Sequence, residues 1–117
     1  MRGRRTAVLL ASPANPTGTS ISKSRLQAIA EEVQRCGGSL IVDEIYQGLV
    51  YDGEDYTALA VSEDCLVVNS FSKFFQMTGW RLGWLVAPNA LIEPLERIAM
   101  NAFLAAPTVA QYAALAA

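Results

Sequence analysis

The chain has 117 residues, 52% of them apolar, which is enough for one hydrophobic core and one domain at most. Its formal net charge of −2 excludes the strongly basic surface that binds nucleic-acid backbones. Because the sequence has no histidine, zinc sites and catalytic pairs that depend on histidine are excluded as well.

The distribution of apolar residues indicates where in the cell the protein is expected. No apolar run approaches the roughly 20 residues that span a bilayer, and the N-terminus lacks the apolar segment of a secretory signal. We therefore expect a cytoplasmic protein with no membrane or nucleic-acid partner, and we interpret the basic cluster Arg2, Arg4 and Arg5 as a solvated flank. Cys36 and Cys65 are predicted to be reduced, buried side chains.

The first predicted elements are a strand, a loop and a helix. Residues 6–11 (TAVLLA) form an unbroken apolar run, which predicts a strand buried on both faces. The prolines and glycine of residues 12–20 predict a loop. A surface helix is then expected between an N-cap at Ser22 and a left-handed Gly37. Its apolar side is formed by Leu26, Ile29, Ala30 and Val33.

Three further strands and two further helices follow. The apolar runs 39–44, 65–72 and 82–88 predict strands. A helix is expected over about 91–104, where Pro94 lies in the first turn or causes a kink. Thr108 and Gln111 have the spacing of a capping box at the start of the last helix. The apolar side of helix 91–104 is formed by Leu95, Ile98, Ala99 and Phe103.

Strands that alternate with loops and helices predict an α/β fold, a three-layer αβα arrangement around a mostly parallel sheet. Such sheets bind ligands beyond the carboxyl ends of their strands. The chain enters its first strand almost at once and ends inside a helix, so we expect it to be a piece of a larger domain.

Polar side chains follow three of the predicted strands. Two serine hydroxyls at alternate positions, Ser70 and Ser72, point to one side of a strand and can both face one phosphate. Arg81 offers a planar cationic fork to the same dianion, and Lys73 can form an imine with an aldehyde.

The end of the second strand offers complementary groups. Asp43 at a buried strand end needs a cationic partner or several hydrogen-bond donors, and a protonated ring nitrogen would satisfy that need. Asn15 and Tyr46 can both hydrogen-bond a phenolic oxygen. Phosphate, aldehyde, ring nitrogen and phenolate are the four polar parts of pyridoxal 5′-phosphate.

Four motifs carry a resemblance to a known family. They are NPTG (15–18), DEIY (43–46), SFSK (70–73) and TGWRLGW (78–84). In this order they resemble the fold-type I pyridoxal-phosphate enzymes, and most closely the class I/II aminotransferases of the aspartate, alanine and aromatic amino-acid type. The resemblance covers essentially the whole chain.

The resemblance implies a role for each polar residue. Lys73 would be the Schiff-base lysine and proton carrier, and Asp43 would pair with the pyridine nitrogen. Tyr46 and Asn15 would bind the phenolic oxygen. The catalytic residues that the resemblance implies are Lys73, Asp43 and Tyr46. The family pattern also implies a cis peptide between Asn15 and Pro16. The remaining implied cofactor contacts are the phosphate ligands Ser70, Ser72 and Arg81 and the ring-packing Ile45.

The resemblance also implies the wider setting. Residues 1–117 would be the middle of the large cofactor-binding domain, without its N-terminal part and without the C-terminal small domain. The whole protein would be a homodimeric transaminase acting on an amino acid and a 2-oxo acid, and the isolated piece is expected to be inactive. Two alternatives stay open: a β-lyase or cyclopropane-forming synthase on the same fold, and an aminotransferase-like ligand-sensing domain of a transcription regulator.

Simpler interpretations of single residues also stay open at this point. Arg81 can be a structural ion-pair partner of Asp43. Ser70 and Ser72 can satisfy local backbone groups, as serines after strands often do. Glu44 is expected to turn away from the site and to form a structural hydrogen bond or ion pair. The aromatic residues of the 70–84 segment are interpreted as packing side chains.

Overall fold

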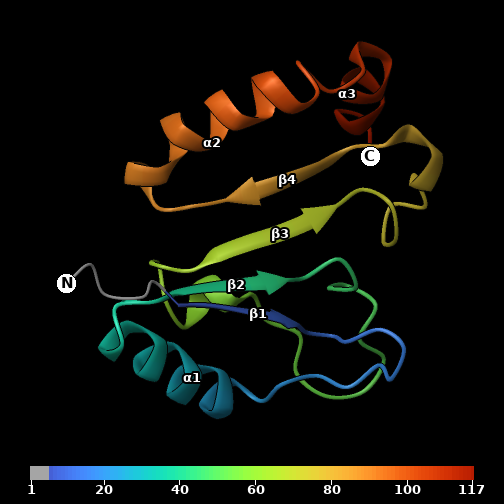
Figure 1. Cartoon of the computed structure of the whole chain (residues 1–117). Helices are drawn as coiled ribbons and strands as arrows, with labels where there is room; N and C mark the ends of the chain where they lie inside the picture. Colours follow the sequence, from blue (N-terminus) through green and yellow to red (C-terminus); the bar gives the residue numbers. More distant parts are fainter. Residues whose placement is uncertain (1–5) are drawn as a thin grey trace.

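A computed structural model describes residues 6–117, so the basic cluster Arg2, Arg4 and Arg5 lies outside the described residues. The described chain folds into one sheet in the strand order β1-β2-β3-β4, with α1 on the β1–β2 side and α2 beside β4 (Figure 1). The strands are β1 (Ala7–Ala11), β2 (Ser39–Asp43), β3 (Leu66–Ser70) and β4 (Gly83–Val86). The helices are α1 (Lys23–Arg35), α2 (Asn89–Ala102), α3 (Thr108–Ala114) and two short 3₁₀ helices, η1 (Ala58–Ala60) and η2 (Thr78–Trp80).

The α/β prediction is confirmed, and the sheet is mixed. β1, β2 and β3 run parallel, with Ala11 opposite Asp43 and Asp43 opposite Val68. β4 runs antiparallel to β3, with Ser70 opposite Gly83. The connection over residues 71–82 contains only η2, so the chain has no long helix to carry it back for a parallel pairing. The lysine-bearing segment is therefore a tight return loop.

The core lies between α1 and the sheet. Leu26 and Val33 on α1 are buried, as are Leu40 and Val42 on β2 and Val67 on β3. The predicted apolar side of α1 is thus confirmed, since Ile29 and Ala30 pack against the same cluster. Each fully buried aliphatic side chain of this kind contributes about 1.5–3 kcal/mol relative to an exposed one.

Both ends of α1 lie at the predicted residues, but the predicted side-chain cap at Ser22 is not formed. Ser22 is the extended N-cap residue, and its carbonyl accepts from Leu26 N at 2.9 Å. Its hydroxyl makes no capping bond and lies instead 3.4 Å from the Ser24 hydroxyl. Gly37 follows the helix with φ +65°, which is the left-handed stop that the sequence predicts.

The other face of β1 is open to solvent, so its predicted burial on both faces is wrong. Leu9 is 69% exposed, and the strand alternates between exposed and half-buried residues. The reason is that α1 covers only one face of this part of the sheet. β4 is exposed along its whole length.

α2 carries an apolar side that nothing in residues 6–117 buries. Pro94 lies inside the helix, beyond its first turn, and none of the helix residues is buried. A groove of about 580 Å³ separates this apolar side from β3 and β4. Its lining includes the predicted apolar positions Leu95, Ile98, Ala99 and Phe103, together with Val68, Trp84 and Leu85.

The start of α3 differs from the predicted capping box. Pro107, not Thr108, is the N-cap residue, because Thr108 already has its place inside the helix. The Gln111 side chain donates to the Ala106 carbonyl at 2.8 Å, outside the helix. In the part of the chain that is described, no helix combines the length and the apolar character that crossing a membrane requires.

Candidate active site

The polar residues predicted to form a site follow the carboxyl ends of β1, β2 and β3. Backbone bonds hold these ends together: Ser12 N donates to the Asp43 carbonyl at 3.0 Å, and Glu44 N donates to the Val68 carbonyl at 2.8 Å. Parallel pairing places all three strand ends at the same edge of the sheet. The sheet therefore gathers segments 12–20, 44–50 and 71–82 at this edge.

One cavity of about 380 Å³ collects most of the predicted residues. Its lining includes a lysine, three hydroxyl residues and an arginine, a set of side chains suited to a phosphate and an aldehyde. Besides the predicted residues, Thr78, Leu82 and Gly83 line it. The predicted residues that line it are Ile45, Ser70, Ser72, Lys73 and Arg81.

The two serine hydroxyls meet, but not along a strand as predicted, because β3 ends at Ser70 and Ser72 lies in the turn that follows. Their hydroxyl oxygens lie 2.7 Å apart, and Ser70 Oγ also accepts from Ser72 N at 2.9 Å. Ser70 Oγ is within 3.1 Å of the Leu82 carbonyl. The local backbone interpretation is thus correct for the bonds of Ser70, while both hydroxyls still border the cavity.

Lys73 is connected to the second strand end through Tyr46. The lysine Nζ lies 5.9 Å from the centroid of the Tyr46 ring, within the range of a cation–π contact. Asn15 Nδ2 donates to the Tyr46 hydroxyl at 3.2 Å. Asn15 and Tyr46 both line a neighbouring cavity of about 530 Å³, so Tyr46 stands between this space and Lys73.

Asp43 ends β2 and lines neither cavity. Its Oδ1 accepts from Ile45 N at 3.0 Å, a bond that shapes the turn leading to Tyr46. Arg81 makes no ion pair with it, and its guanidinium donates instead to the Thr78 carbonyl at 3.1 Å. The structural ion pair considered from the sequence is therefore wrong.

Glu44 points away from the site, as predicted, and is 2% exposed. Its Oε1 accepts from Ala58 N at 2.5 Å and from the Thr57 hydroxyl at 3.2 Å. Burial raises the pKa of the Glu44 carboxyl, and the two hydrogen bonds partly oppose that shift. Glu44 thus fastens η1 to the end of β2.

The loop that carries Lys73 is closed by its own hydrogen bonds. Phe71 N donates to the Leu82 carbonyl at 3.1 Å, and the Thr78 hydroxyl donates to the Ser72 carbonyl at 2.7 Å. Arg81 has φ +54°, in the left-handed region of the backbone that residues other than glycine rarely adopt. The sequence reasoning missed Thr78 as a cavity residue. The position of Thr78 three residues before Arg81, within the TGWRLGW motif, is the signal in the sequence that points to it.

A glycine allows the Tyr46 turn to lie against the same loop. Gly48 has φ +85°, and a Cβ placed on it would lie 2.5 Å from Phe74 Cδ2. Gly48 N also donates to Asp55 Oδ2 at 2.8 Å. Because only glycine fits both the backbone angle and the space, the turn after β2 and the Lys73 loop approach closely here.

Aromatic packing and proline geometry agree with the sequence predictions. Phe71 contacts Phe75 and Trp84 with ring centroids 4.9 Å and 5.0 Å apart. The Asn15–Pro16 peptide is cis, as the resemblance implies, and Ser12–Pro13 is cis as well.

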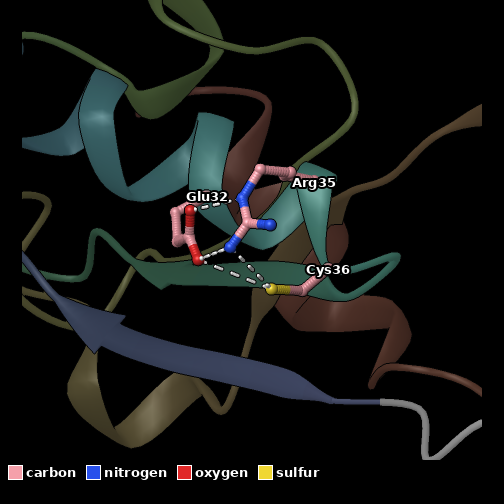
Figure 2. A network of polar contacts seen from close by, with 3 residues as sticks. All are labelled: Glu32, Arg35 and Cys36. Carbon is pink, nitrogen blue, oxygen red and sulfur yellow. Dashed lines mark hydrogen bonds and ion pairs between the residues drawn. The ribbon is translucent and has the colours of Figure 1, made fainter.

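Figure 2 shows a separate polar cluster at the end of α1, formed by Glu32, Arg35 and Cys36. Arg35 donates to both carboxylate oxygens of Glu32, at 2.8 Å and 2.6 Å, and this contact lowers the pKa of the Glu32 carboxyl. Cys36 is exposed because it directly follows the helix, so its predicted burial is wrong. Cys65 is buried as predicted, and both thiols are free.

The sequence is similar to those of known aminotransferases. The family model for aminotransferase class I and II matches residues 2–117. The valine–pyruvate aminotransferase of Mycobacterium tuberculosis is 46% identical over 112 residues, which cover 94% of this chain and 29% of that protein. A (5-formylfuran-3-yl)methyl phosphate transaminase of Methanocaldococcus jannaschii is 39% identical over 114 residues, 95% of this chain and 30% of the relative.

Solved structures give the same answer. An aminotransferase from Mycobacterium tuberculosis superposes with a TM-score of 0.86 at 46% identity, covering 92% of this chain and 30% of that one. A double mutant of Thermus thermophilus aspartate aminotransferase superposes with a TM-score of 0.88 at 35% identity, covering 93% of this chain and 29% of that one. The chain thus spans less than a third of the length of these relatives.

Proposed function

The chain belongs to the aminotransferase class I and II family, and from this membership we propose that the whole protein is a pyridoxal-phosphate-dependent transaminase. It would move an amino group from an amino acid to a 2-oxo acid. The observation that carries the proposal is the cavity in which Lys73 lies with Ser70, Ser72 and Arg81. The aminotransferase names of similar proteins support it.

The donor set of the cavity fits a phosphate monoester. The hydroxyls of Ser70 and Ser72 lie 2.7 Å apart, and the Arg81 guanidinium is engaged only by a backbone carbonyl within the described residues. These groups would bind the phosphate oxygens through charge-assisted hydrogen bonds. Ile45 lines the same space and would pack against the apolar ring.

Asp43 and Tyr46 do not line the 380 Å³ cavity, but their polar groups match those that the ring requires. Asp43 has one carboxylate oxygen bonded to Ile45 N and a second with no hydrogen-bond partner among the described residues. That second oxygen would hold a proton on the ring nitrogen. Tyr46 accepts from Asn15, so its own hydroxyl proton is available to the phenolic oxygen.

When bound, pyridoxal phosphate supplies an aldehyde carbon and a ring that accepts electrons. Lys73 is the amine of this cavity, and no ion pair engages it within residues 6–117. Its Nζ would carry the proton that leaves and re-enters the substrate during transfer. Tyr46, under the Lys73 amine, would orient it.

Three wider expectations belong to this proposal. Residues 1–117 would form the central part of the large cofactor-binding domain, and this agrees with the share of the relatives' length that the chain spans. The whole protein would act as a homodimer. Its location would be the cytoplasm.

A first experiment tests the site on this chain. The chain is incubated with pyridoxal 5′-phosphate, reduced with borohydride and digested, and the adduct is located by mass spectrometry. Lys23 and Lys73 are the only lysines of the sequence, so Lys23→Ala and Lys73→Ala are matched variants. We expect a stoichiometric adduct on Lys73, retained in Lys23→Ala and lost in Lys73→Ala. Equal labelling of both lysines would contradict the proposed site.

A second experiment tests the reaction in the whole protein. Amino transfer is followed as formation of a new 2-oxo acid from each of several amino acids, and Lys73→Ala is expected to abolish it. Release of ammonia and pyruvate from cystathionine, without amino transfer, would instead favour the β-lyase alternative.

A further inference from the structure

Thr78 contacts both sides of the loop that carries Lys73. Its hydroxyl donates to the Ser72 carbonyl at 2.7 Å, and its own carbonyl accepts from Arg81 Nη1 at 3.1 Å. Thr78 also lines the 380 Å³ cavity between these two residues. A single residue at the start of η2 therefore links the lysine side of the cavity to the arginine side.

The bond to Ser72 is well placed to fix the lysine. The Ser72 carbonyl belongs to the peptide bond that leads directly into Lys73, and Ser72 is only 7% exposed. Within residues 6–117, the Thr78 hydroxyl is the one hydrogen-bond partner found for that carbonyl. A carbonyl in such a position is held in one orientation by its donor and loses a favourable interaction when the donor is removed.

The hydrogen bond from Arg81 to the Thr78 carbonyl restricts the orientation of the guanidinium. Arg81 is exposed and has a left-handed backbone. Among the described residues, the Thr78 carbonyl is the only hydrogen-bond partner of the guanidinium. Holding this side chain in advance lowers the entropy that binding would otherwise cost.

We propose that Thr78 is a positioning residue of the cofactor site, whose hydroxyl fixes the Ser72–Lys73 peptide while its carbonyl orients the Arg81 guanidinium. The residue that would bind the aldehyde and the arginine that would bind the phosphate are thereby both held at the same cavity. This proposal rests on the proposed function, because it needs Lys73 and Arg81 to contact the same ligand.

The test compares three variants with the unsubstituted chain. Thr78→Val keeps the branched shape without the hydroxyl, Thr78→Ser keeps the hydroxyl, and Thr108→Val makes the same change at an exposed threonine of α3. The yields of the reduced adduct on Lys73 and on Lys23 are measured against the concentration of pyridoxal 5′-phosphate. Circular dichroism and urea unfolding establish that every variant is folded under the labelling conditions.

The expected result is specific to the hydroxyl. Thr78→Val should raise the concentration that half-saturates Lys73 by about fivefold, equal to about 1 kcal/mol, and should lower the ratio of Lys73 to Lys23 labelling. Thr78→Ser should restore both values, and Thr108→Val should leave both unchanged.

Two outcomes would count against the proposal, and they are distinguishable. If the unsubstituted chain labels Lys73 selectively and folded Thr78→Val does so at the same concentration, the role of Thr78 is wrong and the proposed function stands. If the unsubstituted chain labels both lysines equally, the proposed site fails, and the role of Thr78 fails with it.

Discussion

The two halves of the molecule carry apolar side chains in similar patterns and bury them very differently. Where α1 closes over β2 and β3, Leu26 and Val42 are each 1% exposed. On the other side, β4 and α2 contain no buried residue, and Ile98 and Phe103 are 65% and 63% exposed. An apolar pattern thus indicates which side of an element avoids water, and burial additionally requires an opposing element.

The candidate site lies where these two halves meet. Its loop leaves β3, which belongs to the packed half, and enters β4, which is exposed. Ser72 is buried at the first end of the loop, and Arg81 is exposed at the second. The residues that hold the loop therefore rely on local hydrogen bonds more than on core packing.

The largest expected effect comes from shortening a buried leucine, compared with an exposed one after α3. Leu26→Ala removes a fully buried side chain and should lower the free energy of unfolding by about 2–5 kcal/mol, because a cavity remains. Leu115→Ala makes the same change at a residue that is 84% exposed, where a change within about 0.5 kcal/mol is expected. Urea unfolding of the two variants measures both values. Comparable losses would mean that Leu115 is packed in solution as closely as Leu26 is.

A smaller effect is expected at the contact between the Tyr46 turn and the Lys73 loop. At Gly48 an alanine would combine a positive φ with a Cβ that clashes with Phe74. At Gly53 the φ is also positive, at +99°, but an added Cβ would have no atom within 4 Å. The difference between the two variants therefore isolates the clash, and we expect Gly48→Ala to be less stable by about 1–3 kcal/mol.

The same pair tests whether this contact matters for the site. Displacing Phe74 moves the residue next to Lys73, so Gly48→Ala should also lower adduct formation on Lys73, measured under conditions where the variant is folded. Gly53→Ala should label as the unsubstituted chain does. Equal stability and equal labelling of the two variants would show that the Phe74 ring can move aside without affecting either the fold or the site.

Much of the fold and of the site follows from the sequence because those features are local. The buried side of α1 is predicted by helical spacing, and the left-handed stop by Gly37. Side-chain alternation along a strand predicts that Ser70 and Ser72 share a face, but β3 ends at Ser70 and their hydroxyls meet through the turn that follows it. That Glu44 turns away from Asp43 follows from the same alternation.

The features that the sequence did not predict depend on the rest of the fold. The exposure of Leu9 depends on which face α1 covers, and the antiparallel direction of β4 depends on the short return loop. The absence of an ion pair between Arg81 and Asp43 depends on the left-handed turn that directs the guanidinium to Thr78. None of these is encoded in the spacing of one segment.

The smallest expected effect is a pH dependence that distinguishes the buried carboxyl from its exposed counterparts. Burial raises the pKa of Glu44 above its ordinary value of 4.5, so the folded state holds this proton more tightly than the unfolded state does. The stability that Glu44 contributes is thus fully present below that value and is lost as the pH rises through the raised pKa. Glu44→Gln keeps an oxygen that can accept from Ala58 N and Thr57, and it cannot ionise.

The free energy of unfolding of Glu44→Gln, relative to the unsubstituted chain, should therefore increase between about pH 4 and about pH 7. Urea unfolding across this range measures the difference. Glu32→Gln is the control, because contact with Arg35 lowers the pKa of that exposed carboxyl, and its relative stability should move in the opposite direction or stay flat. A parallel trend in both variants would mean that Glu44 titrates like a surface carboxyl, and that η1 is not held to β2 through a desolvated group.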